Sequence, residues 1–185
     1  INANPPWNGY YTLDSGYFMN LHFSQFMDKG WSFIFDACYS DAKAGGDGHA
    51  LVDAKYSYIT ACSNDGDYST IITNTTSEPI TYNFEVTNLA KADNEVYVWE
   101  TRGPDEGQEY NANYFKKIST VTPENGKYSV TIKPYSMITV STLNISEPEF
   151  DVPQESDNKL LSLPYTDDFG YSDEFLASRA VSYTH

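Results

Sequence analysis

Carboxylates are the most abundant side chains in this sequence that could perform acid–base chemistry, since Asp and Glu make up 26 of its 185 residues. A catalytic pair of carboxylates needs one member whose pKa is raised by burial. The candidates lie instead in turn-like or loop-like stretches, where acidic residues usually only solvate the chain. They are Asp41, Asp47, Asp65, Asp67, Glu106 and Glu109. We therefore predict no catalytic residue within this chain.

The three histidines, His22, His49 and His185, are isolated from one another. None forms a pair at metal-ligand spacing with a cysteine or carboxylate. The sequence also has no glycine-rich loop that could cradle a phosphate, and no nucleophile elbow. We therefore expect no cofactor in this chain alone.

Aromatic residues make up 16% of the sequence, including three tryptophans and sixteen tyrosines. Exposed aromatic faces can stack on sugar rings, so this composition raises carbohydrate binding as a function. Trp31 begins a strand-like run and Trp99 lies within another, which favours packing roles for both. Trp7 lies in a proline-flanked loop, and we take it as the candidate ligand-binding residue.

The net charge of −15 argues against binding to nucleic acid or to an anionic membrane, because the eleven Lys and Arg residues are scattered. No apolar run approaches the roughly 20 residues needed to span a bilayer. The chain opens on Ile1, and INANPPWNGYY is typical of the interior of a longer protein.

Cys38 and Cys62 lie at the ends of strand-like runs, so both a disulfide and two free thiols remain open. Asn74 and Asn144 each begin a glycosylation sequon, NTT and NIS. The sequons matter only if the protein is secreted from a eukaryotic cell.

One helix is predicted near the start of the chain. Apolar residues in the stretch 15–27 recur at spacings of three and four, with Ser15 as the expected N-cap and Gly30 as the stop. After this helix the period of the pattern changes to that of β-strands.

The stretch KYSVTIKPYSMITVSTL, residues 127–143, predicts two strands with a corner at Pro134. Other strands are predicted at residues 31–39, 56–62, 68–74, 80–88, 95–101 and 114–121, with a hairpin turn at 63–67. Their alternation places Tyr82, Phe84, Val86, Tyr128, Val130 and Ile132 in the core. The predicted fold is mainly β: an antiparallel β-sandwich of about 7–9 strands, preceded by one short helix and followed by an irregular linker.

Three segments together resemble galactocerebrosidase-type glycoside hydrolases (family 59-like). PWNGYY (6–11), HFSQF (22–26) and Gly30-Trp31 are similar to the end of the family's (β/α)8 barrel and the re-entry into its sandwich. The run from SYITACSNDGDYSTIITNTT through EVYVWET to residue 143 resembles the sandwich itself, and LPYTDDF (163–169) resembles the entry to a lectin-like domain.

The resemblance implies four regions: a loop and last barrel helix (1–29), a β-sandwich (30–143), a linker (144–163) and the start of a lectin-like domain (164–185). It implies a secreted or lysosomal retaining β-glycosidase, of β-galactosidase or galactosylceramidase type, as the parent protein. The catalytic glutamates of that family lie on barrel strands upstream of the Pro-Trp segment and have no counterpart here. The family also offers a sandwich arginine to galactose near the level of residues 76–81, where this chain has none.

Asp168, the second Asp of the Asp-Asp-Phe segment, resembles a calcium ligand of the family's lectin-like domain. Calcium takes six to eight oxygen ligands, and the other ligands come from later in that domain. We therefore expect Asp168 to bind Ca²⁺ only in a longer parent protein.

Two functions from different classes follow. The chain is a non-catalytic sandwich that packs on the catalytic barrel and the lectin-like domain of its parent, or it is an independent carbohydrate-binding module. A free module has no use for an amphipathic helix at residues 15–27 that belongs against a barrel. A third interpretation is an adhesion-like sandwich with no role in sugar binding.

Overall fold

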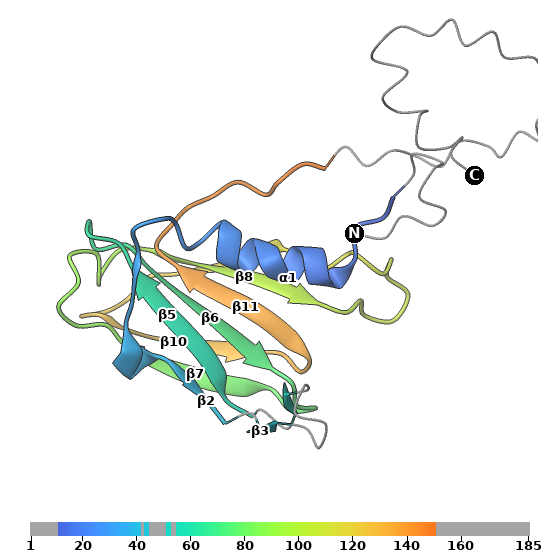
Figure 1. Cartoon of the computed structure of the whole chain (residues 1–185), viewed down its shortest axis with the longest axis horizontal. Coiled ribbons are helices and arrows are strands. Elements are labelled where there is room, and N and C mark those ends of the chain that lie inside the picture. The colour runs from blue at the N-terminus through green and yellow to red at the C-terminus, as the bar shows by residue number, and fades with distance from the viewer. Residues whose placement is uncertain (1–10, 42, 45–50, 53–54, 151–185) are drawn as a thin grey trace, which may run out of the picture. The chain divides into compact units, whose positions relative to one another are not determined.

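A computed structural model describes residues 11–41, 43–44, 51–52 and 55–150. Residues 14–148 form one compact unit, and all the elements described below lie in it. The unit is built from one α-helix and antiparallel sheets (Figure 1). Within the described residues, no helix is long and apolar enough to cross a membrane.

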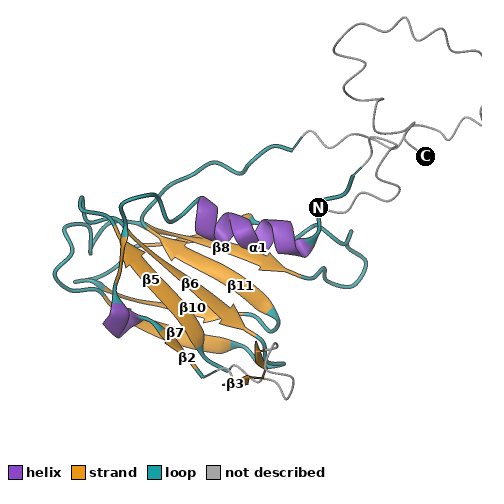
Figure 2. Ribbon diagram, viewed as in Figure 1, coloured by secondary structure: helices purple, strands orange, loops and turns teal. Residues whose placement is uncertain are grey.

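Helix α1 (Ser15–Ser24) packs on one face of the larger sheet, over strands β8 and β11 (Figure 2). Its buried residues Phe18, Leu21 and His22 follow the predicted spacing of three and four. The N-cap is Asp14 rather than Ser15, and it makes no side-chain capping bond. The helix ends three residues before the predicted end and does not run to Gly30, yet Phe26 in the following turn is fully buried.

The larger sheet has seven strands in the order β1-β5-β6-β11-β8-β9, with β2 also paired to β5. Its strands are β1 (Ser32–Phe33), β2 (Tyr39–Ser40), β5 (Ser57–Cys62), β6 (Tyr68–Asn74), β8 (Val96–Arg102), β9 (Lys116–Val121) and β11 (Ser136–Ser141). All of its pairings are antiparallel. Strand β11 lies at its centre, between β6 and β8.

A second sheet of two strands, β7 (Ile80–Glu85) and β10 (Lys127–Ile132), faces the larger one. A short ladder joins β3 (Lys43–Ala44) to β4 (Leu51–Val52). In the described part of the chain the two facing sheets therefore hold nine antiparallel strands, which confirms the predicted fold class.

The core lies between the two sheets and follows the predicted alternation. Tyr128, Val130 and Ile132 are buried, and the residues between them are exposed. They pack against the inward side chains of the larger sheet, which include Tyr68, Ile72, Val96, Val98, Ile138 and Val140. The chain crosses from one sheet to the other at Pro134 and Tyr135, as the proline predicted, and Tyr135 takes a positive φ of 49°.

Residues 31–39 do not form the predicted continuous strand. The 3-10 helix η1 (Phe35–Ala37) interrupts it and leaves the two-residue strands β1 and β2 on either side. Alternating hydrophobicity could not reveal this break, because the residues on both sides of it pair with the same strand, β5.

Candidate functional site

The two residues predicted to bind a ligand and a metal, Trp7 and Asp168, lie outside the described residues. The same is true of Asp47, His49 and His185. Among the residues that the structure does describe, no group of three or more His, Cys, Asp or Glu side chains could hold a metal ion. The roles of Trp7 and Asp168 therefore stay predictions.

Two of the carboxylates singled out from the sequence, Asp41 and Asp67, stabilise the fold. Asp41 Oδ1 accepts a hydrogen bond of 2.8 Å from the Tyr56 backbone N–H. Asp67 accepts one from the Thr142 hydroxyl and pairs with Lys91. The remaining three, Asp65, Glu106 and Glu109, are exposed.

Glu100 is a buried carboxylate that turn and loop composition could not reveal, because it lies inside a strand and is only 2% exposed. Its Oε1 lies 2.8 Å from Arg102 Nε and 3.4 Å from Lys133 Nζ. Hydrogen bonds from Arg102 to Asp105 lower the pKa of Asp105, and the same bonds raise the pKa of Arg102. Glu100 thus has two cations as neighbours and anchors the start of the loop after β8, which is a structural arrangement.

His22 is fully buried between α1 and the sheet. Its Nδ1 lies 2.7 Å from Thr139 Oγ1 on β11, and its Nε2 lies 2.8 Å from Thr101 Oγ1 on β8. Burial lowers the pKa of His22 to about 3. The side chain is therefore a neutral link that holds the helix on the sheet.

The two cysteines are free thiols, and both are half-buried. The Cys38 Sγ–H donates to the Ile34 carbonyl at 3.2 Å, and Sγ accepts from the Thr60 N–H at 3.4 Å. Of the two alternatives left open by the sequence, the structure has the free thiols.

The asparagines of the two sequons differ in solvent exposure. Asn74 is 1% exposed, and its Nδ2 donates to the carbonyls of Glu78 at 2.8 Å and Lys133 at 2.9 Å. Asn144 is exposed after the end of β11. Glycosylation at Asn74 is incompatible with this fold, because its amide nitrogen is buried and already bonded.

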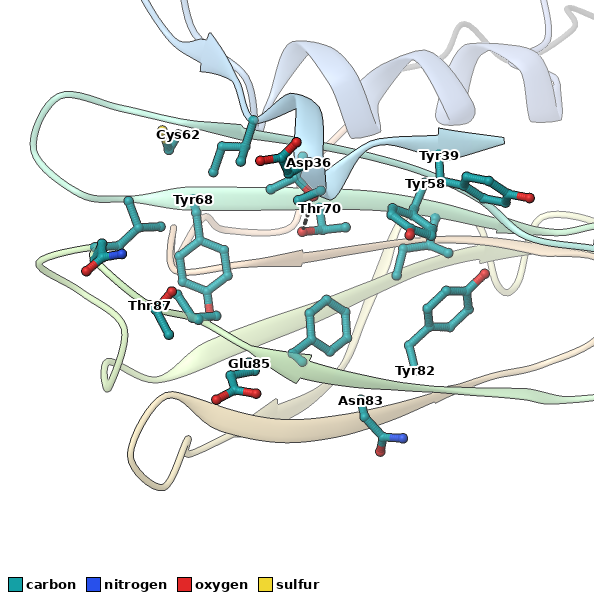
Figure 3. Close-up of a pocket in the computed structure, with 18 of the residues that line it drawn as sticks. Asp36, Tyr39, Tyr58, Cys62, Tyr68, Thr70, Tyr82, Asn83, Glu85 and Thr87 are labelled. Carbon is teal, nitrogen blue, oxygen red and sulfur yellow. Dashed lines mark hydrogen bonds between the residues drawn. The ribbon is translucent and has the colours of Figure 1, made fainter. Parts of the chain in front are cut away.

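A groove of about 1090 Å³ lies between β7 and the β5–β6 part of the larger sheet (Figure 3). Its walls come from strands far apart in the sequence. They include Tyr58, Thr60 and Cys62 of β5, Tyr68, Thr70 and Ile72 of β6, and Tyr82 to Val86 on the opposite side. The groove is the part of the sandwich interior that the two-stranded sheet leaves open.

Tyrosines gather at one end of this groove. Tyr82 packs edge-on against Tyr58 and Tyr56, with ring centroids 5.8 and 6.2 Å away. Burial, followed by the neighbouring tyrosines and Asp41, raises the pKa of Tyr82 to about 12. The Tyr82 hydroxyl therefore stays protonated near neutral pH, and the cluster lines this end of the groove with aromatic rings.

The outward side of α1 is a second surface of interest. Met19 and Phe23 are 39% and 42% exposed there, although Phe18 and Leu21 are buried on the other side. Phe33 is 53% exposed and pairs with Ala61, whose side chain lies on the helix-covered face of the sheet. A helix with apolar residues on both sides is typical of one that is covered on both sides.

Comparison with solved structures gives the class of protein first. The fold matches part of a family 30 endoxylanase from Clostridium papyrosolvens C71, with a TM-score of 0.50, 14% identity and coverage of 70% of this chain and 28% of that one. A family 30 xylanase from Clostridium acetobutylicum, Xyn30A, gives a TM-score of 0.50, 17% identity and coverage of 71% and 30%. The fold is therefore one found as a portion of larger glycoside hydrolases.

The comparison of sequences identifies a particular relative. The chain is similar to galactocerebrosidase of Danio rerio, with 23% identity over 184 residues that cover 91% of this chain and 26% of that protein. This confirms the resemblance drawn from the sequence. No protein-family model matches, and the chain spans about a quarter of the length of this relative.

Proposed function

We propose that this chain is the non-catalytic β-sandwich portion of a secreted glycoside hydrolase, and that it packs on the catalytic barrel of its parent through α1. The observation that carries the proposal is the exposed apolar surface of Met19, Phe23 and Phe33 on the helix-covered side of the sheet. The similarity to a galactocerebrosidase about four times as long supplies the class of the parent. On this proposal α1 is the last helix of the barrel, and the parent is a retaining β-glycosidase that acts on β-galactosides.

A double variant tests the helix contact, namely Met19→Asp with Phe23→Asp. In the isolated chain both side chains face solvent, so we expect a melting temperature close to that of the wild type. In the parent protein the same pair would place two charges in a buried contact, so the melting temperature and the activity should both fall. Ile118→Asp is the comparison variant, because Ile118 is similarly exposed, at 43%, but lies on β9 and not on α1. If the double variant and the control behave alike in the parent, α1 is not the contact.

The same proposal assigns hydrolysis to the parent and not to this chain. Purified alone, the chain should release no nitrophenol from p-nitrophenyl β-galactoside above a buffer blank. Turnover that a point mutation within this chain abolished would contradict the proposal and would place the catalytic carboxylates here.

A further inference from the structure

The pairing of β7 with β10 determines which way the backbone groups of β7 point. The Val86 N–H donates to the Gly126 carbonyl at 2.8 Å, whereas the Lys127 N–H and C=O both bond to Glu124. Val86 therefore takes a hydrogen-bonded position, and the register pair Glu85↔Lys127 next to it is a non-bonded one. Hydrogen-bonded and non-bonded pairs alternate along an antiparallel ladder. The backbone N–H and C=O groups of Thr81, Asn83 and Glu85 therefore point away from β10, toward the groove side of the strand.

That edge of β7 lacks the features that usually protect an edge strand. Proteins usually prevent such edges from pairing with another strand by means of lysine, proline, bulges or very short edge strands. In the larger sheet, β9 carries Lys116 and Lys117 and a register shift opposite Val98 and Trp99, and β1 and β2 at the other edge have two residues each. Strand β7, ITYNFE, has neither lysine nor proline, and its ladder with β10 has no shift. Among the described residues no strand pairs along its outer edge.

The groove beside this edge lies where a further strand of the two-stranded sheet would be, between β7 and strands β5 and β6. A strand added to β7 would lie about 4.8 Å from it and about 10 Å above the larger sheet. At that position it would cover the inward side chains of β5, including Tyr58 and Cys62, which the second sheet leaves half-buried. It would also close the exposed sides of Phe84 and Val86, which are half-buried for the same reason.

Several polar side chains of the groove walls point away from the groove or bond to one another. Asn83 and Glu85 point away from it (Figure 3), and the Thr60 and Thr70 hydroxyls bond to each other at 2.9 Å. A sugar needs side-chain donors and acceptors aimed into its site, whereas a peptide strand can use the backbone groups of β7 and needs only apolar walls.

We infer that β7 is the acceptor edge for a further β-strand, and that an extended segment of the parent polypeptide from outside residues 1–185 fills the groove. Alternate side chains of that segment are apolar and pack against Phe84, Tyr58 and Cys62. The similar galactocerebrosidase is about four times as long as this chain, so a parent of that length has ample polypeptide to supply the strand. The inference rests on the proposed function only in requiring a longer parent.

A proline on each edge of the two-stranded sheet provides a matched test. Asn83 and Ser129 are opposite each other in a pair whose N–H groups point outward, and their side chains share one hydrogen bond of 2.7 Å. Asn83→Pro and Ser129→Pro therefore lose the same side-chain bond and no bond of the β7–β10 ladder. Only Asn83→Pro blocks the acceptor edge.

In the isolated chain we expect the two variants to melt at the same temperature, within a degree or two. In the parent protein, Asn83→Pro should melt several degrees lower than Ser129→Pro. Equal melting temperatures in the parent would overturn the inference. The Met19 and Phe23 variants of the preceding section report on the helix contact separately, so failure of either idea can be told from failure of the other.

Binding of the dye 8-anilinonaphthalene-1-sulfonate distinguishes a strand of the parent from the other possible occupants of the groove, which are a sugar and a second copy of the chain. The isolated chain should bind this dye in the open groove and the parent should not. Displacement of the dye by xylotriose or galactobiose would identify a sugar site instead. A dimer of the isolated chain in sedimentation that Asn83→Pro abolishes would identify a second copy as the occupant. Either result would overturn the inference.

Discussion

The two faces of the seven-stranded sheet are built from different chemistry. The inner face presents aliphatic and tyrosine side chains such as Ile72, Val98 and Ile138 to the second sheet. The outer face under α1 combines Trp99 and Phe115 with buried hydroxyls, among them Thr101 and Thr139 on either side of His22. The inner face is thus held mainly by apolar burial, while the outer face also depends on directional bonds that fix where the helix lies.

Of the variants considered, Trp99→Ala on the outer face should cause the largest loss of stability. Trp99 is fully buried on the outer face, with ring centroids 5.0 Å from Phe115 and 5.8 Å from Phe26. Its loss should lower the free energy of unfolding by about 3–5 kcal/mol through the transfer and cavity terms together. Urea denaturation followed by tyrosine fluorescence or circular dichroism measures this. A cost under about 1 kcal/mol would mean that the helix side contributes little to the stability of the unit.

The pH dependence of stability should also come from the outer face, through His22. The pKa of His22 is about 3 in the folded protein and 6.5 as its ordinary value, so below pH 6.5 the unfolded chain binds a proton that the folded chain does not. Stability should therefore fall as the pH drops from 6.5 toward 3, by up to about 1.4 kcal/mol per pH unit from this residue.

The control for this slope is His22→Leu. It should be less stable at pH 7, because Thr101 and Thr139 lose their partner, but its stability should change less between pH 6.5 and 4.5. A variant with the same slope as the wild type would show that His22 is not the group responsible.

On the inner face, Phe84→Ala should have a smaller effect in the isolated chain. Phe84 stacks on Tyr128 with centroids 4.6 Å apart, but it is only half-buried at the wall of the groove. We expect a cost of about 1–3 kcal/mol, below the value for a fully buried phenylalanine. Urea denaturation of the isolated chain and of the parent would sharpen the comparison, because a filled groove raises the cost in the parent. Equal costs in both would argue that Phe84 has the same surroundings in each.

How far the sequence could predict the structure differs between the same two faces. Period-two alternation identified Phe84 and Tyr128 as inward-facing, and Pro134 marked the crossing between sheets. Alternation could not identify Thr101 or Thr139 as buried, because threonine is read as polar and the helix that covers them is remote in sequence. Nor could it show that Glu100 would be buried, since that depends on two cations, one of which, Lys133, lies just after strand β10.

The candidate surfaces were harder to predict than the fold. The helix was predicted from the spacing of Phe18 and Leu21, but the exposure of Met19 and Phe23 depends on what covers the other side. The groove arises because two strands face seven, which is a property of tertiary topology and leaves no local signal in the sequence of β7. For the same reason, Trp7 was singled out by composition, whereas Tyr58 and Tyr82 become neighbours only in the folded chain.

The central claim is that the outward surface of α1 is covered by another part of the parent protein. The most direct measurement is maleimide labelling of Met19→Cys, quantified by mass spectrometry of the peptide that contains residue 19, in the isolated chain and in the parent. Tyr135→Cys is the control, because Tyr135 is 66% exposed at the corner between β10 and β11. We predict fast labelling of both sites in the isolated chain, and labelling of residue 19 at least about 100-fold slower in the parent, as expected for a site that reacts only after a local opening of a few kcal/mol. Equal labelling of residue 19 in the two proteins would contradict the account.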